Sequence, residues 1–233
     1  MQKAEKKRLF LAFTPPFLFV LFIALIKLFE WHFDLSLGKW GILPREMTGL
    51  RGVLFSPLIH GDFNHLFNNA IALLALGWTL FYFYKSLAIR IVLWSWLLAG
   101  LYTWISARHN YHIGASGLVY SLFGFLFVSG FLRRSNSLIA ISFLVAFLYG
   151  SLIWGILPWD QKMSWEGHFW GLLVGIVLAV YYRKQGPQRK VYEWNEEEEE
   201  EQKEDQQLEL GNQQSPQINY EYHYIPKNKD DTD

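Results

Sequence analysis

The 233-residue sequence contains no cysteine. This absence excludes a disulfide framework, a thiolate metal site and a cysteine nucleophile. Charged residues are also scarce in six long apolar runs. They cover 13–31, 64–84, 90–107, 115–132, 137–157 and 166–182. Three of these runs contain no Asp, Glu, Lys or Arg, and the other three carry charged residues only toward one end.

A helix needs roughly 20 mostly apolar residues to cross a bilayer. The six runs therefore predict an all-α, polytopic membrane protein with six spanning helices. In the first run we expect Thr14 to cap the helix and Pro15 to lie in its first turn; a kinked helix that begins near Arg8 is the alternative. Lys27 is expected to extend its charge to the interface. The long, aromatic-rich segment 32–63 is expected to lie partly in the interface, against the bundle.

The sequence divides into an N-terminal segment 1–12, a membrane domain 13–183 and an acidic, polar tail 184–233. The tail contains EWNEEEEEEQKED, whose like charges and lack of apolar periodicity predict disorder. Basic residues concentrate before the first run, after the second, after the fourth and after the sixth. This distribution predicts that both termini are cytoplasmic, in a multi-pass protein of the inner or plasma membrane.

With this orientation, the second, fourth and sixth runs all begin on the outer side. Polar residues lie in the first turns of these three runs: His65, Asn69, Ser116 and His168. An unpaired polar group in hydrocarbon costs several kcal/mol, so polar residues at matching depth indicate function.

Ser116 lies in the segment GASG, whose small residues leave its hydroxyl open to a substrate carbonyl. A serine hydroxyl is a weak nucleophile unless a base lies beside it. His168 is the candidate base, because it lies in GHFWGLLVG, where the spacing of Gly167, Gly171 and Gly175 favours close helix packing. Tyr120 follows Ser116 by four residues and is expected to orient the imidazole.

His65 and Asn69 are also four residues apart and share one helix face. Acyl transfer generates an oxyanion that preorganised donors stabilise. We expect these two side chains and the Ser116 backbone N–H to supply those donors.

Three segments carry a family resemblance. HLFNN at 65–69, GASG at 114–117 with Tyr120 and Gly124, and GHFWGLLVG at 167–175 resemble the rhomboid intramembrane serine proteases. The resemblance covers about residues 10–183. It implies a six-helix core and a serine–histidine dyad without a third, acidic member.

Matched by motif, the family's nucleophile falls on Ser116, its base on His168 and the aromatic partner of that base on Tyr120. The family's oxyanion residues fall on His65 and Asn69. His60, five residues before His65, fits the family's H-x-x-x-x-H pattern.

The resemblance also implies the substrates: single-span or polytopic membrane proteins, cut in or near a transmembrane segment. The lipid bilayer is the expected surrounding, and neither a cofactor, a metal nor a nucleic acid is expected. The segment 158–165 before His168 is a candidate mobile cap. One departure concerns the first outer loop, where many members carry a Trp-Arg pair and this chain has only separate Trp40, Arg45 and Arg51.

Three other functions stay open. In a transporter or channel, the histidines and Asn69 would line a polar pathway. A non-catalytic membrane-binding protein could use the same scaffold, with the acidic tail as its working part. A metalloprotease or metal carrier would use His60, Asp62 and His65, or His109 and His112, although no H-E-x-x-H motif occurs.

Overall fold

The computed structural model describes residues 3–159, 163–188, 205–207, 221 and 223. The chain divides into two units, 1–190 and 191–233. All the named helices belong to the first unit. The predicted disorder of the tail falls almost entirely outside the described residues and stays a prediction, as do the domain boundaries.

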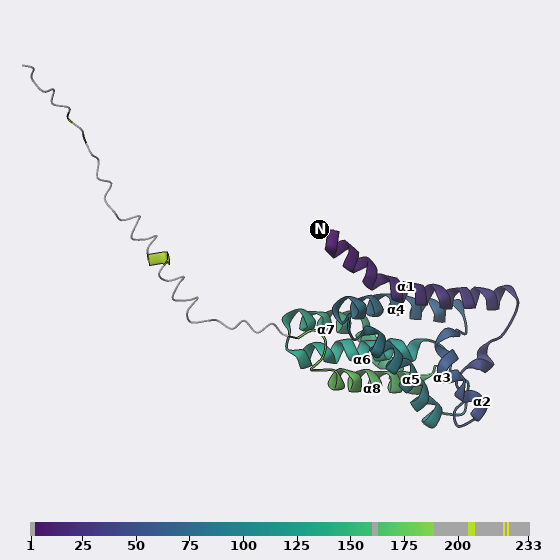
Figure 1. Cartoon of the computed structure of the whole chain (residues 1–233). Helices are drawn as coiled ribbons and strands as arrows, with labels where there is room; N and C mark the ends of the chain where they lie inside the picture. The colour runs from purple at the N-terminus through teal and green to yellow at the C-terminus, as the bar shows by residue number, and fades with distance from the viewer. Residues whose placement is uncertain (1–2, 160–162, 189–204, 208–220, 222, 224–233) are drawn as a thin grey trace, which may run out of the picture. The chain divides into compact units, whose positions relative to one another are not determined.

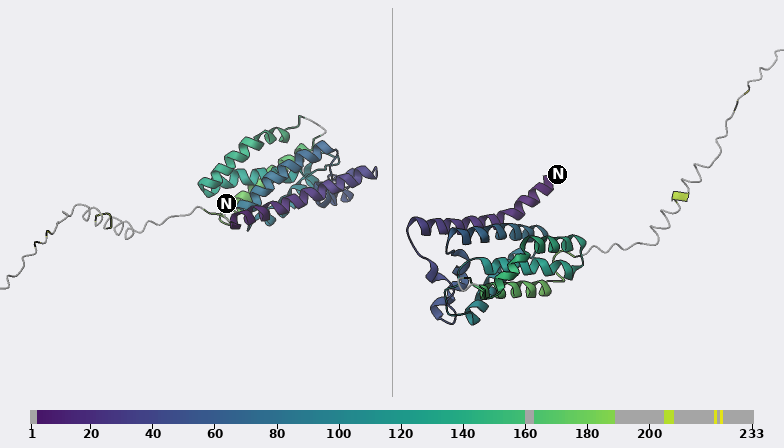
Figure 2. Two further views of the ribbon diagram at one scale, coloured as in Figure 1. Left: turned by 90° about the horizontal axis from the view of Figure 1, so that it is seen from above. Right: turned by 180° about the vertical axis from the view of Figure 1, so that it is seen from behind.

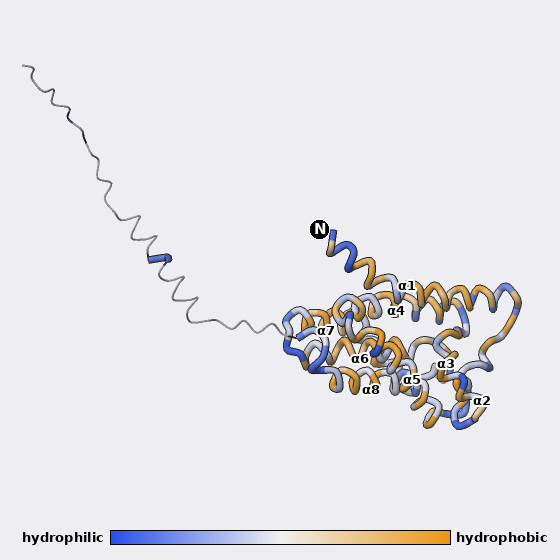
Figure 3. Tube along the Cα trace, viewed as in Figure 1, coloured by the Kyte–Doolittle hydropathy of each residue, from blue (hydrophilic) through white to orange (hydrophobic). Residues whose placement is uncertain are grey.

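Long apolar helices build the first unit (Figure 1). They are α1 (Lys3–His32), α4 (Phe63–Phe83), α5 (Ala88–Ser106), α6 (Ser116–Arg133), α7 (Asn136–Tyr149) and α8 (Trp165–Tyr181). The described residues provide five helices long and apolar enough to span a membrane, counting α7 with its continuation, and α8 is a shorter apolar helix. Apolar residues dominate these helices in Figure 3. The predicted all-α, polytopic bundle is confirmed.

The first helix differs from the prediction. It begins at Lys3, includes most of the predicted N-terminal segment and carries Pro15 and Pro16 in its interior. Thr14 does not cap it, because its hydroxyl donates to the Phe10 carbonyl at 2.8 Å inside the helix. The predicted cap is therefore wrong, and the structure is closer to the kinked alternative. Figures 1 and 2 show that α1 changes direction along its length, as interior prolines cause.

Lys27 does not extend into water as expected. Its side chain is only 12% exposed and lies 2.9 Å from the Glu30 carboxylate. The Lys27 amine also donates to the Gly61 carbonyl at 3.0 Å. The Lys27 charge is thus neutralised by Glu30 within the protein. The hydrogen bond to Gly61 connects α1 to the loop that precedes α4.

Helix α6 packs against α4, α5, α7 and α8. Its contact with α8 depends on glycine. A Cβ atom added at Gly171 would lie 2.2 Å from the Gly117 carbonyl oxygen, and one at Gly175 would lie 2.1 Å from that of Ser121. The predicted close approach of these two helices is confirmed, because only glycine leaves room for it.

The loop between α1 and α4, which the sequence predicts on the outer side, contains the short helices η1 (Gly38–Trp40), α2 (Met47–Leu50), α3 (Gly52–Phe55) and η2 (Ser56–Leu58). It packs on α5: the Trp96 indole donates to the Val53 carbonyl at 3.1 Å, and the Trp104 indole donates to that of Glu46 at 2.9 Å. Trp40 and Arg51 meet although they are separate in sequence, with the guanidinium carbon 4.4 Å from the ring centroid. The loop therefore covers one side of the bundle, as expected.

The span predicted at 137–157 is not one continuous α-helix. α7 ends at Tyr149, and the 3₁₀-helix η3 follows over Gly150–Ile156. Glycine lowers helix propensity, and this segment has it at Gly150 and Gly155. Within η3, carbonyl groups become available to side chains of other helices. Residues 160–162 of the predicted cap lie outside the described part of the chain.

Candidate active site

Ser116 and His168 lie in contact although they are far apart in sequence. Ser116 is the first residue of α6, and His168 is the fourth residue of α8. The His168 Nε2 atom lies 2.8 Å from the Ser116 Oγ atom. The imidazole is nearly buried, with His168 only 6% exposed. The predicted contact is therefore present, formed where the glycine-mediated crossing brings the two helix N-termini together.

The other ring nitrogen of His168 determines the tautomer. Its Nδ1 atom lies 2.9 Å from the Gly155 carbonyl oxygen in η3. A carbonyl oxygen only accepts hydrogen bonds, so Nδ1 carries the proton and Nε2 presents a lone pair to the Ser116 hydroxyl. This is the tautomer that can accept a proton from serine. The Gly155 carbonyl thus orients the ring in place of an acidic residue.

Tyr120 stacks on the His168 imidazole. The ring centroids are 4.3 Å apart and the planes differ by 7°. The Tyr120 hydroxyl donates to the Leu152 carbonyl oxygen in η3 at 2.7 Å. A Cβ atom added at Gly155 would lie 1.9 Å from the Tyr120 hydroxyl, so this glycine is required for the packing. The imidazole is thereby held between a ring face and a backbone carbonyl.

His65 and Asn69 lie beside the segment that leads into Ser116. A Cβ atom added at Gly114 would lie 2.5 Å from the His65 Nε2 atom and 3.6 Å from the Asn69 Nδ2 atom. Gly114 has a φ angle of 107°, a conformation that favours glycine. The buried Asn69 Nδ2 atom has no hydrogen-bond partner among the described residues. A buried, unsatisfied donor next to a serine is available to a substrate oxygen.

His60 also contacts the segment that leads into Ser116. It is 1% exposed, and its Nε2 atom accepts a hydrogen bond from the Ala115 backbone N–H at 3.4 Å. Its ring packs edge-on against His65, with the centroids 5.1 Å apart. Burial, followed by the charge of His65, lowers the pKa of His60 to about 3. His60 is therefore neutral at pH 7 and keeps the lone pair that this bond needs.

A cavity opens beside the pair. Its walls include His65, Asn69, Ser116, Tyr120 and His168, and it is also lined by residues of the loops that precede α4, α6 and α8. The five predicted site residues therefore face one space at one end of the bundle. Its loop residues Gly61, Asp62 and Tyr111 are exposed, so the space opens to the surface on the side of these loops.

The residues proposed as metal ligands have other partners. The His112 Nδ1 atom lies 2.6 Å from the Ser164 hydroxyl, and the His109 Nε2 atom lies 3.5 Å from a Glu46 carboxylate oxygen. No group of three or more His, Asp or Glu side chains suited to a metal ion occurs within the described ranges. The third alternative function thus gains no support from the geometry.

Several groups around the dyad were not predicted from the sequence. The carbonyls of Leu152 and Gly155 had no sequence signal, because backbone carbonyls are present at every position. Arg108, Glu166 and Ser164 were also missed. The signal for Glu166 was available, since it is the one acidic residue in the sixth apolar run.

This fold and site define a class: polytopic helical membrane proteins in which a serine and a histidine meet at a cavity near the ends of glycine-packed helices. The Rhomboid domain family model matches residues 48–185. The chain belongs to the rhomboid family, a family of intramembrane proteases that act on membrane proteins. It is accordingly an integral, multi-pass membrane protein.

Similar proteins occur in mycobacteria. The chain is 34% identical over 198 residues to the uncharacterized protein Rv1337 of Mycobacterium tuberculosis, across 81% of this chain and 82% of the relative. The uncharacterized protein Mb1372 of Mycobacterium bovis gives the same values. The uncharacterized protein ML1171 of Mycobacterium leprae is 32% identical over 182 residues, across 74% of this chain and 71% of the relative. These names state no activity, so the proposal below depends on the site.

Proposed function

We propose that this protein is an intramembrane serine endopeptidase that cleaves membrane-anchored proteins in or near a transmembrane segment. Ser116 is the nucleophile and His168 is the general base. The observation that carries the proposal is the 2.8 Å contact between the Ser116 hydroxyl and the Nε2 atom of His168, whose Nδ1 atom is bonded to the Gly155 carbonyl. This arrangement supplies the activated alcohol that acyl transfer requires.

The reaction proceeds in two halves. Ser116 Oγ attacks the substrate carbonyl while His168 Nε2 takes its proton, and His168 then gives that proton to the leaving amine. Water entering through the cavity then attacks the acyl-serine while His168 takes its proton, and His168 returns that proton to Ser116 Oγ as the bond to the acid product breaks. The carbonyl oxygen becomes negative in both halves. The Asn69 amide, the His65 imidazole and the Ser116 backbone N–H stabilise it, together with the positive end of the α6 dipole.

The substrate must expose a carbonyl to this site. A transmembrane helix hides its carbonyls in internal hydrogen bonds, so the cleaved segment unwinds locally before attack. The basic residues that flank the helices favour cytoplasmic termini in an inner or plasma membrane. This orientation opens the cavity toward the outer side.

The test is the incubation of purified full-length protein with a model single-span substrate, followed by mapping of the cut. We expect the natural sequence to cleave, and Ser116→Ala and His168→Ala to insert and fold but not to cleave. The matched control is Ser137→Ala, which changes an exposed serine at the start of α7 and should leave cleavage unchanged. Failure of clean, folded protein to cleave any such substrate would contradict the proposal and favour the non-catalytic alternative.

The remaining alternatives predict different results. A transporter or channel would retain solute flux in Ser116→Ala. A metalloprotease would lose cleavage on treatment with a chelator, whereas the serine peptidase keeps it.

A further inference from the structure

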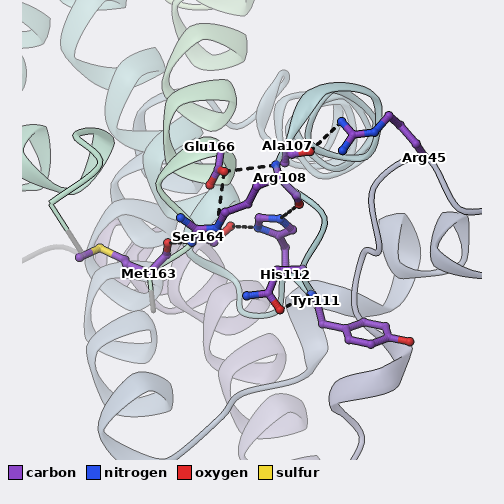
Figure 4. A network of polar contacts seen from close by, with 9 residues as sticks. Arg45, Ala107, Arg108, Tyr111, His112, Met163, Ser164 and Glu166 are labelled. Carbon is purple, nitrogen blue, oxygen red and sulfur yellow. Dashed lines mark hydrogen bonds and ion pairs between the residues drawn. The ribbon is translucent and has the colours of Figure 1, made fainter. Parts of the chain in front are cut away.

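A polar network joins the loop that precedes α6 to the first turn of α8 (Figure 4). The Arg108 backbone N–H donates to the Glu166 Oε1 atom at 3.3 Å, and the Arg108 Nε atom lies 3.7 Å from the same oxygen. The Glu166 side chain is 7% exposed and that of Arg108 is 30% exposed. Glu166 is therefore a nearly buried carboxylate whose charge is matched by a cation on a neighbouring loop.

A second connection links the same two segments. The His112 Nε2 atom lies 3.1 Å from the Arg108 carbonyl oxygen, so Nε2 carries the proton and Nδ1 accepts the hydrogen bond from the Ser164 hydroxyl. The Ser164 carbonyl in turn accepts the His168 backbone N–H at 3.1 Å. Burial lowers the pKa of His112, which favours the neutral ring that this pattern needs. Both connections therefore join the loop that precedes α6 to the start of α8, at Glu166 and at Ser164.

The position of these connections matters for His168. Glu166 lies two residues before His168 in the first turn of α8. Its bound oxygen faces Arg108, and Glu166 is not among the residues that line the cavity. Because a displacement of about 1 Å can cost about 10²-fold in rate, the start of α8 must be fixed closely. A residue that fixes it acts on catalysis without touching the substrate.

We propose that Glu166 is a positioning residue, which through Arg108 holds the first turn of α8 so that His168 stays in hydrogen-bond contact with Ser116. This inference rests on the proposed peptidase function. The buried Glu166 carboxylate thus affects the turnover rate and does not bind the substrate.

The test compares Glu166→Gln and Glu166→Ala with the natural sequence in the full-length protein. Glu166→Gln keeps an acceptor for the Arg108 N–H but removes the charge. Three quantities are measured per folded molecule: kcat and KM on the single-span substrate, and the rate of Ser116 labelling by a fluorophosphonate. We expect kcat and the labelling rate to fall by about 10-fold in the Gln variant and by about 10²-fold in the Ala variant, with KM unchanged.

Three further variants separate positioning from general stability. Arg108→Lys keeps the positive charge and should label faster than Arg108→Ala, also per folded molecule. Glu46→Gln is the matched control, because it removes an exposed carboxylate that pairs with His109, the residue after Arg108, and it should behave as the natural sequence does.

The possible results are distinguishable. If folded Glu166 variants label and turn over at the natural rate, or if only KM changes, positioning by Glu166 is refuted while the peptidase function stands. If the natural sequence itself neither labels at Ser116 nor cleaves, both proposals fail together. Should Glu166→Ala not fold, Glu166→Gln and Arg108→Lys decide the question in the same way.

Discussion

The close crossing of α6 and α8 gives the sharpest prediction about the dyad, through the substitution Gly171→Ala. Gly171 lies three residues after His168, where α8 approaches the backbone of α6 closely through glycine. A Cβ atom there would lie 2.2 Å from the Gly117 carbonyl oxygen. The obstacle is backbone, so no side-chain rotation can relieve the overlap.

The size of the effect follows from these distances. Restoring an ordinary contact of 3.4 Å requires a separation about 1.2 Å larger, and even the closest tolerated contact of 3.0 Å requires about 0.8 Å more. The contact between Ser116 and His168 now measures 2.8 Å. If α8 shifts away by that amount, the two atoms move to about 3.6–4.0 Å, beyond hydrogen-bond distance. We therefore expect kcat to fall by about 10²-fold.

The assay measures kcat and KM on the single-span substrate, the fluorophosphonate labelling rate, and the thermal midpoint of the same preparation. The matched control is Gly38→Ala in η1, because a Cβ atom there would meet only the Ser36 hydroxyl oxygen at 3.8 Å, an ordinary contact. Folded Gly171→Ala protein that labels and cleaves like the control would refute the reasoning that this crossing holds the dyad together.

Two more predictions concern the groups around the dyad. Asn69→Ala should lower kcat by about 10²-fold, because one oxyanion donor is lost, whereas Asn64→Ala removes an exposed amide from the same helix and should leave kinetics unchanged. For His60, the pKa falls from 6.5 to about 3 on folding, so the unfolded chain binds the extra proton between these values. Stability is then complete above about pH 6.5 and declines as pH falls, by up to about 1.4 kcal/mol per pH unit. His60→Gln should remove this part of the slope in unfolding measurements, and an unchanged slope would contradict the assignment.

Much of the fold could be predicted because a bilayer imposes a length and a composition on each helix. Charge-free runs of about the right length mark α4, α6 and α7 without reference to packing. The meeting of Ser116 and His168 was also predictable, since glycine spacing and similar depth both indicated it. In each case the sequence signal is local to one helix.

The parts that could not be predicted depend on contacts between distant segments. Glycine at 150 and 155 indicates a weakened helix, but it does not show that a 3₁₀-helix forms or that the Gly155 carbonyl orients His168. The pairing of Arg108 with Glu166 joins positions 58 residues apart. The start of α1 was misjudged because prolines that would limit a soluble helix are tolerated inside a spanning one.

The central claim is that His168 activates Ser116, and adduct mapping tests it most directly. Purified full-length protein is treated with a fluorophosphonate, and the modified residue is identified by mass spectrometry in the natural sequence and in His168→Ala. We expect one adduct on Ser116 in the natural sequence and none in the variant. An adduct on another residue, or equal modification of Ser116 without His168, would contradict it.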